Sequence, residues 1–559
     1  MNYRIYDRLR RASSPLEVDL IESYAQGRVT RRDFVRRGAL LGLSLPFLKA
    51  VVGAAPQGNL RPGTTPGTSA AAPALKDGGT VKVTVQKPSG PLDPLAMADL
   101  GSYGIVAQSF EHLLKLGPDG TIGPGLAESW EMNADGSEWT FKLRQGVTWQ
   151  SGAPFTADDV VATMDRLTTG GNAALGGVLK TGGAKAADAN TVVFTLEGPN
   201  GQFPALVSVF NAQAVITPKD WVAGSTADAK RDGTGPWKMV NYDQNTGATF
   251  ERNDAWWGGK TRLDKVEWVF NNDSASRVSG LQGGAVDAIV QIDVLGSEGL
   301  QADSANFKII SLRTATHRQI WMRNDTGQFT DKRVRQALAM TLDRELMVQQ
   351  LFSGQGEVAN DHPIAPVYQY FDAAAVPQRT RDIEGAKKLL AEAGVSGLKA
   401  TMFAPELNEI PQLAELVKQN AAEAGIDITL AVESTDTFYN EWCLTYDPIC
   451  DGGQEFGIVD YGHRPTPDTY LNAAYATGEW NSAHFKNDAF NAAFKEYQGA
   501  LDLAALTAAC GKMQKIANDE VPYAIPYFYN YLSAHSTKVA GIQISALGQM
   551  FLDQAGFVA

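Results

Sequence analysis

Residues 460–464, with the sequence DYGHR, carry the side chains best suited to hold a charged solute. Asp460 and Arg464 are four residues apart in a predicted loop bounded by glycine and proline. A carboxylate and a guanidinium can hold opposite ends of a zwitterion, and the guanidinium can bind a carboxylate through two parallel hydrogen bonds. The alternative is an internal ion pair between Asp460 and Arg464 that only shapes the loop, because such local pairs contribute little when exposed.

Aromatic and imidazole side chains complete the predicted pocket. We expect Tyr461 to belong to the same polar anchor, and His463 to orient the loop as a hydrogen-bond donor. Tyr439, Trp442 and Trp149 are the expected pocket walls. Ligand sites combine apolar walls of this kind with a few polar contacts that fix the ligand.

Signatures of other chemistries are missing from the sequence. There is no HExxH motif and no pair of cysteines at metal-binding spacing, and the six histidines stand singly, so we expect no structural metal and no cofactor. A GxSxG nucleophile elbow is also absent. Gly259-Lys260-Thr261 does not end a phosphate loop, because Asp254 stands where that motif requires glycine. Scattered Ser, His and Asp residues could still meet in space, so a secreted hydrolase on a two-lobed scaffold is kept as the alternative function.

Length and charge limit the class of protein. The 559 residues exceed the roughly 250 to 300 at which one hydrophobic core stops growing, so we expect at least two lobes. The composition, 44% hydrophobic and 20% charged, is typical of a soluble globular protein. The net charge is -13, and removal of the first 55 residues leaves 39 basic and 57 acidic residues. A protein this acidic is a poor partner for nucleic acid or an anionic membrane.

The N-terminal segment is predicted to direct export. Residues 30–35 (TRRDFV) match the twin-arginine signature, and the apolar run that follows at 38–47 is too short to span a membrane. The alternative for this segment is a basic amphipathic helix. Cleavage is expected at Gly53-Ala54-Ala55 or within residues 69–72, and no cysteine near either position supports a lipid anchor.

The three cysteines allow more than one pairing. Cys443 and Cys450 could close a small loop in an oxidising periplasm, but Cys510 makes the number odd. The sequence therefore does not assign the pairing, and a free buried thiol is an equal alternative for any one of the three.

Among the supporting elements, residues 133–149 have the clearest local pattern. After a turn at 133–136, apolar and polar residues alternate from Trp139 to Leu143, which is the period-2 pattern of a half-buried strand. Gln145-Gly146 is expected to turn this strand into a return arm at 147–149, completing a hairpin.

Capping residues and glycines mark the expected helices. Thr156 and Asp159 form a capping-box start for a helix that ends at Gly170-Gly171. Residues 109–116 are also expected to be helical, with His112 packed or at the surface. Helix-then-strand succession in the second half of the chain indicates an α/β lobe. The other expected helices are 329–341, 346–352, 382–394 and 413–424, and the other expected strands are 80–86, 191–196, 266–270, 426–432 and the extended segment 522–531.

Four sequence segments together carry a family pattern: GLAESW at 125–130, DG at 135–136, WTFKLR at 139–144 and GAPFTADDV at 152–160. They resemble the signature of the family 5 extracytoplasmic solute-binding proteins of ABC importers, which comprise oligopeptide, dipeptide and nickel binders. Further matches extend the resemblance from about Gly78 to the C-terminal region.

The resemblance implies an α/β, two-lobed periplasmic binding protein (Venus flytrap) fold with an extra small subdomain in the first lobe. It implies a periplasmic monomer that is not an enzyme, captures a peptide or a related small zwitterionic or polar solute between its lobes, and delivers it to the membrane permease subunits. The chain should cross between lobes near residues 311–316 and 519–527. The expected parts are a signal peptide at 1–55, a flexible leader at 56–77, lobe I at 78–116, 234–313 and 521–559, the small subdomain at 117–233, and lobe II at 314–520.

The resemblance also bears on the ligand. In peptide-binding relatives an Asp in a Trp-x-x-Asp-Tyr-like segment pairs with the ligand's α-ammonium, and the matching position here is Asp460. Gly457 stands where the Trp would be, and an insertion-like segment at 451–455 precedes it, which puts a standard peptide ligand in doubt. An opine, a glycoside or a metal chelate therefore stays open as the ligand, although the absence of a His or Cys cluster ranks the chelate low.

Overall fold

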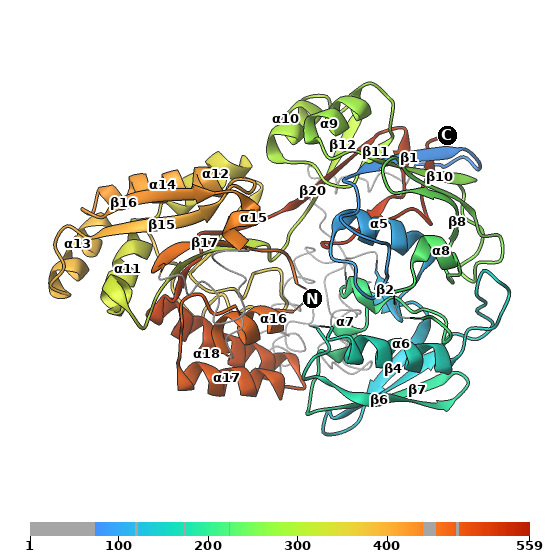
Figure 1. The fold of residues 1–559 in the computed structure, drawn as a ribbon, viewed down its shortest axis with the longest axis horizontal. Coiled ribbons are helices and arrows are strands. Elements are labelled where there is room, and N and C mark those ends of the chain that lie inside the picture. The colour runs from blue at the N-terminus through green and yellow to red at the C-terminus, as the bar shows by residue number, and fades with distance from the viewer. Residues whose placement is uncertain are drawn as a thin grey trace, which may run out of the picture. The chain divides into compact units, whose positions relative to one another are not determined.

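The computed structural model describes residues 73–117, 121–172, 174–222, 224–439, 454–464, 466–476 and 480–559. The predicted signal peptide, Trp442, Cys443 and Cys450 lie outside these residues. Ala74 to Ala559 form one unit of mixed α/β structure with two large β-sheets and a smaller one, as expected for a two-lobed protein (Figure 1). None of the described helices has both the length and the apolar character needed to cross a membrane.

The first large sheet forms the core of lobe I. Its central strand β1 (Thr80–Val85) confirms the strand predicted there, and it pairs in parallel with β10 (Lys265–Phe270) along its whole length. The sheet order is β12-β20-β11-β1-β10-β9-β8. The remaining strands are β8 (Trp237–Asp243), β9 (Gly247–Arg252), β11 (Ala288–Ile289), β12 (Phe307–Leu312) and β20 (Tyr531–Ser536).

The helix predicted at 109–116 is wrong, because the helix precedes that segment. Helix α5 (Leu100–Ser109) starts at Asp99, whose side chain accepts a hydrogen bond from the Ser102 amide. A Cβ at Gly104 would lie 2.7 Å from the Trp268 ring, so this glycine lets the helix approach the sheet closely. Glycines lower intrinsic helix propensity, which hid the helix in the sequence.

The small subdomain contains a four-stranded sheet in the order β4-β5-β7-β6. The alternating strand is confirmed as β5 (Glu138–Leu143), but the predicted hairpin is wrong: β5 pairs with β4 and with β7, so both of its edges are occupied. The predicted return arm instead folds onto the residues after it, with the Trp149 amide donating to the Ala153 carbonyl at 2.8 Å. The other three strands are β4 (Ala127–Met132), β6 (Leu179–Asp188) and β7 (Thr191–Leu196).

Helix α6 (Ala157–Thr169) packs on this small sheet, against β6. It begins with the predicted capping box, in which the Thr156 amide donates to the Asp159 carboxylate at 2.8 Å, and Gly170 ends it. The sequence therefore located both ends of this helix.

The second large sheet forms the core of lobe II, in the order β14-β19-β13-β17-β15-β16. Figure 1 shows α12 and α14 above β15 and β16, and α14 contacts both of these strands. The predicted helices of this lobe are confirmed as α11 (Lys332–Thr341), α12 (Arg344–Phe352), α13 (Ile383–Glu392) and α14 (Ile410–Ala422). The strands are β13 (His317–Met322), β14 (Gly356–Val358), β15 (Lys399–Pro405), β16 (Asp427–Glu433), β17 (Phe456–Tyr461), β19 (Tyr527–Tyr529) and the short β18 (Tyr523–Ala524).

The chain passes between the two large sheets twice. Leu312 ends β12 in the first sheet and His317 starts β13 in the second, so the first crossing lies in the predicted segment. The return lies at Asn530, between β19 in the second sheet and β20 in the first. The predicted return at 519–527 is therefore wrong by a few residues, because β18 and β19 still pair with β13.

The last residues of the predicted leader belong to the folded unit. Leu75 forms a β-bridge with Val558, and the Lys76 amide donates to the Phe557 carbonyl at 2.8 Å. A flexible leader extending to residue 77 is therefore wrong for residues 74–76, because the C-terminal end of the chain supplies their backbone partners.

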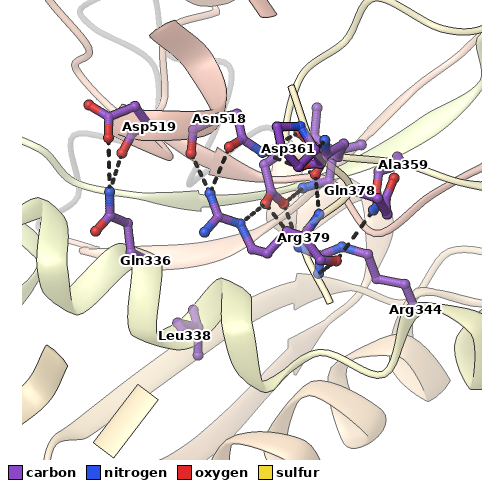
Figure 2. Close-up of polar contacts among 12 residues, drawn as sticks. Gln336, Leu338, Arg344, Ala359, Asp361, Gln378, Arg379, Asn518 and Asp519 are labelled. Carbon is purple, nitrogen blue, oxygen red and sulfur yellow. Dashed lines mark hydrogen bonds and ion pairs between the residues drawn. The ribbon is translucent and has the colours of Figure 1, made fainter. Parts of the chain in front are cut away.

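A buried ion cluster holds the loop that carries Asp361 in lobe II. Figure 2 shows Asp361 between Arg344 and Arg379. The Arg344 guanidinium donates to both Asp361 oxygens at 2.7 and 2.9 Å, and Arg379 Nε donates at 2.8 Å. The Ile525 amide adds a bond at 3.1 Å. The Asp361 side chain is fully buried, so this carboxylate neutralises charge inside the lobe.

Candidate ligand-binding site

A cavity of about 520 Å³ lies between elements of the two lobes. Its volume falls within the roughly 300 to 1,000 Å³ typical of small-molecule sites. Residues from lobe I, the small subdomain, the first crossing and lobe II contribute to its wall. The described lining residues include Gln202, Phe210, Arg313, Val367, Tyr368 and His463.

Asp460 lies on β17 rather than in the predicted loop, which begins only after Tyr461 because the strand pairs with β13 up to that residue. Every residue of β17 is paired with β13, and Asp460 lies opposite Arg318. The Tyr439 hydroxyl donates to the Asp460 carboxylate through a short hydrogen bond. The structure therefore brings together two of the predicted site residues, Asp460 and Tyr439.

Gly457 explains the departure from the family pattern. A Cβ at Gly457 would lie 2.6 Å from the Phe403 carbonyl oxygen and 2.7 Å from the Trp321 ring. Trp321 is the residue paired with Gly457 across the β13–β17 ladder. An indole is thus supplied by the neighbouring strand, and a tryptophan at position 457 would not fit.

The buried Arg318 is a feature that the sequence interpretation missed. Its side chain is 1% exposed and forms an ion pair with Glu409 at 2.8 Å. Arg318 Nη2 also donates to the Tyr529 hydroxyl at 2.9 Å, and the Tyr527 hydroxyl donates to Glu409 at 3.0 Å. The signal was an arginine within HRQIWM, a strand buried at every position. Buried charges need partners, and this network holds Arg318 next to Asp460, its neighbour on the adjacent strand.

Asp460 and Arg464 do not pair with each other in the structure. Arg464 Nη1 donates to the His463 carbonyl at 3.1 Å, and the Tyr368 hydroxyl donates to the Arg464 carbonyl at 2.9 Å. No acidic side chain in the described part of the chain forms an ion pair with Arg464. The internal ion pair considered from the sequence is therefore not what shapes this loop.

His463 holds the loop to the first crossing, but not in the predicted role. The Ala315 amide donates to His463 Nδ1 at 3.0 Å, so His463 accepts this bond rather than donating it. The ring is 8% exposed, and burial, followed by the charge of Arg464, lowers the pKa of His463 to about 3. The imidazole is therefore neutral at any physiological pH.

Of the remaining predicted site residues, Tyr461 and Trp149 are packed into hydrophobic cores. Tyr461 is 7% exposed and its ring stacks on His317 at a centroid distance of 5.4 Å, which places it in the aromatic core of lobe II. Trp149 is 3% exposed, packs on Phe155 and belongs to the core of the small subdomain, and it is not among the residues that line the cavity. Trp442 lies outside the described residues. The cavity is instead walled by residues such as Tyr368, which the sequence did not single out.

No group of His, Cys, Asp and Glu side chains that could hold a metal ion is found among the residues described here. Cys510 is buried and free, and burial raises the pKa of its thiol, which keeps it protonated. The site is therefore built from hydrogen-bonding and apolar groups.

Comparison with known proteins identifies the family to which this chain belongs. The family model described as bacterial extracellular solute-binding proteins, family 5, matches residues 121–482. The chain belongs to this family. The match covers the small subdomain, the first crossing and most of lobe II, including the anchor loop.

Relatives extend over most of the chain. The sequence is 26% identical over 482 residues to haem-binding protein A of Haemophilus influenzae, covering 79% of this chain and 86% of that protein. It is 26% identical over 484 residues to the periplasmic oligopeptide-binding protein OppA of Escherichia coli, covering 78% and 85%. The fold is similar to that of the ABC transporter substrate-binding protein CtaP of Listeria monocytogenes, with a TM-score of 0.77 at 22% identity, covering 87% and 100% of the two chains.

Proposed function

We propose that this protein is the periplasmic binding component of an ABC importer, and that it captures a peptide or a related small zwitterionic solute between its lobes. The cavity of about 520 Å³, walled by both lobes and by the first crossing, is the observation that carries this proposal. Its relatives include a protein named for oligopeptide binding, and its family binds solutes. Native mass spectrometry of the protein purified from its own cell would identify the solute that copurifies.

Asp460 and Arg464 are the proposed charged anchors. Asp460 is held by Tyr439 and lies opposite Arg318, whereas Arg464 has no carboxylate partner among the described residues. A ligand ammonium at Asp460 and a ligand carboxylate at Arg464 would complete both partnerships. Neither side chain is among the residues that line the cavity, but Arg464 directly follows the lining residue His463, and an anion would stabilise a guanidinium that has no carboxylate partner among the described residues.

Calorimetry with the copurified solute tests these anchors. We expect Asp460→Asn and Arg464→Gln each to lose about 2 to 5 kcal/mol of binding free energy, as truncated buried charge pairs do. Lys512→Gln is the matched control, because Lys512 is an exposed cation paired with Glu496 on the surface of lobe II. Affinities close to wild type in both anchor variants, with an unchanged circular dichroism spectrum, would place the site elsewhere.

We propose that ligand binding closes the lobes about the two crossings. The segments between β12 and β13 and between β19 and β20 are the connections across which such a hinge would bend. Closure would exclude water and make a few polar contacts selective. Small-angle scattering should show compaction on addition of the solute, and an unchanged radius of gyration would contradict the hinge.

The proposed cellular setting is export through the twin-arginine route, no lipid anchor, a monomeric state and delivery of the solute to the permease. Two alternatives have separate outcomes. Turnover of a generic ester or peptide by the purified protein would support a hydrolase, and a copurified metal complex would support a chelate binder. Neither is favoured by family membership.

A further inference from the structure

His463 contributes to the wall of the cavity with one of its ring nitrogens already engaged. The donor to Nδ1 is the backbone amide of Ala315, 148 residues earlier in the sequence and within the first crossing. Nε2 has no hydrogen-bond partner among the described residues, and it is not among the enclosed side-chain atoms that lack a partner. Because His463 lines the cavity, Nε2 is the ring atom open to a ligand.

The contact with Ala315 fixes the tautomer of this histidine. A backbone amide nitrogen can only donate, so Nδ1 must offer its lone pair. In a neutral imidazole the proton then resides on Nε2. The cavity therefore receives an N–H donor from His463 and no free lone pair.

The described wall of the cavity favours a negatively charged acceptor. It contains no aspartate and no glutamate, although the chain has 62 acidic residues. Its one arginine, Arg313, is already paired with Glu357 at 2.5 Å. Arg464, next to His463, adds a positive charge that has no carboxylate partner among the described residues.

We propose that the solute presents a carboxylate to the Nε2–H of His463, and that this histidine selects an organic acid over a haem or metal chelate bound through its ring. A metal-ligating histidine uses a lone pair on one nitrogen and donates the N–H of the other to an acceptor. His463 has the reverse arrangement, since its second nitrogen receives a backbone N–H. The assignment rests on the proposed function, because it names the chemical class of solute for the same cavity.

Nitrogen NMR tests the tautomer without any ligand. Long-range ¹H–¹⁵N spectra of the uniformly labelled protein distinguish the two neutral forms, and the chain has six histidines to resolve. The His463→Gln spectrum assigns the signal by its loss. We expect the Nε2–H form near neutral pH, and a signal of the Nδ1–H form would overturn the proposal even if the protein binds peptides.

Matched ligands test the selection. Trialanine and its C-terminal amide differ in the carboxylate alone, and we expect the wild-type protein to bind the acid about tenfold or more tightly than the amide, because a hydrogen bond to a charged group contributes on that scale. In His463→Ala the preference should fall markedly, whereas His484→Asn, a control in which asparagine tolerates the left-handed backbone at that position, should keep it. Equal affinity of the wild-type protein for the two peptides would contradict the proposal.

Two further outcomes distinguish a failure of the proposed peptide-binding function from a failure of the proposed role of His463. If neither peptide binds, the proposed peptide function fails while the tautomer measurement still decides the assignment of His463. If haemin binds the wild-type protein with an absorbance change that His463→Ala abolishes, the selection of an organic acid is wrong.

Discussion

The buried ion pairs of Asp361 lead to a specific prediction for the free energy of unfolding. This carboxylate is fully buried between Arg344, whose side chain is 3% exposed, and Arg379, at 15% (Figure 2). Two guanidinium groups thus share one buried counter-charge. Removing one partner of a buried ion pair leaves an uncompensated charge and costs about 3 to 5 kcal/mol. We expect Asp361→Asn to lower the free energy of unfolding by about that amount.

Asparagine is the right replacement because it isolates the charge. Asp361 has a φ of 59°, a left-handed conformation that Asn adopts as readily as Asp. The amide oxygen can still accept the bond from the Ile525 amide, which Asp361 accepts at 3.1 Å. Backbone strain and the loss of that bond therefore contribute little to the expected effect.

Two further variants should lose less unfolding free energy than Asp361→Asn, which gives an expected ranking of the three losses. Arg379→Gln leaves Asp361 paired with Arg344 through bonds of 2.7 and 2.9 Å, so its cost should be smaller, about 1 to 3 kcal/mol. Glu384→Gln is the surface control: Glu384 is 84% exposed and pairs with Lys387 one turn away on the same helix, so it should change stability by less than about 0.5 kcal/mol.

Urea unfolding followed by tryptophan fluorescence measures these differences, with the free energy extrapolated linearly to water. A loss below about 1 kcal/mol for Asp361→Asn, or a loss no larger than that of Arg379→Gln, would refute the reasoning, because the buried charge would then not be what makes the substitution costly.

Three other predictions test separate features. Replacing both Arg31 and Arg32 by Lys should retain the precursor in the cytoplasm, as seen by immunoblot of cell fractions, and normal export would contradict the twin-arginine assignment. Thr156→Ala should cost about 1 kcal/mol in urea unfolding because it removes a helix cap, and an unchanged midpoint would show that the capping box contributes nothing. Hydrogen bonding from Arg323 is the main reason that the pKa of Asp325 falls to about 2. A carboxylate whose pKa is lowered in the folded protein stabilises the fold at pH values above its unfolded-state pKa, and this stabilisation is lost as the pH falls through its folded-state pKa. The difference in Tm between wild type and Asp325→Asn should therefore shrink from about pH 4 to about pH 2. A constant difference would disprove the linkage.

The sequence predicted helices and strands correctly where the determining pattern lies in residues that are neighbours along the chain. The alternation from Trp139 to Leu143 predicted β5, because side chains of a strand point to opposite faces in turn. Thr156 and Asp159 predicted the start of α6, because their groups satisfy the free amides of its first turn. The same reasoning failed at α5, where Gly104 contributes close packing rather than helix propensity.

The sequence did not predict which strands pair when they are far apart along the chain. The sequence indicated a strand near residue 139 but not that β4 and β7 would occupy its two edges, so the hairpin was assigned to the wrong neighbours. Trp149 has the composition of a pocket wall, yet it lies in the core of the small subdomain. Side-chain type alone does not distinguish a buried aromatic residue from one that lines a cavity.

The sequence by itself determined the family signature, the two-lobed α/β class and the segment that carries Asp460, His463 and Arg464, because each is encoded in contiguous residues. Only the tertiary structure decided how those groups are used. It set Arg318 opposite Asp460 on the adjacent strand, left Arg464 without a carboxylate partner among the described residues, and joined His463 to the Ala315 amide from 148 residues away. These relations depend on which strands pair and where the chain crosses between lobes, and packing of the whole chain, rather than any local pattern, determines both.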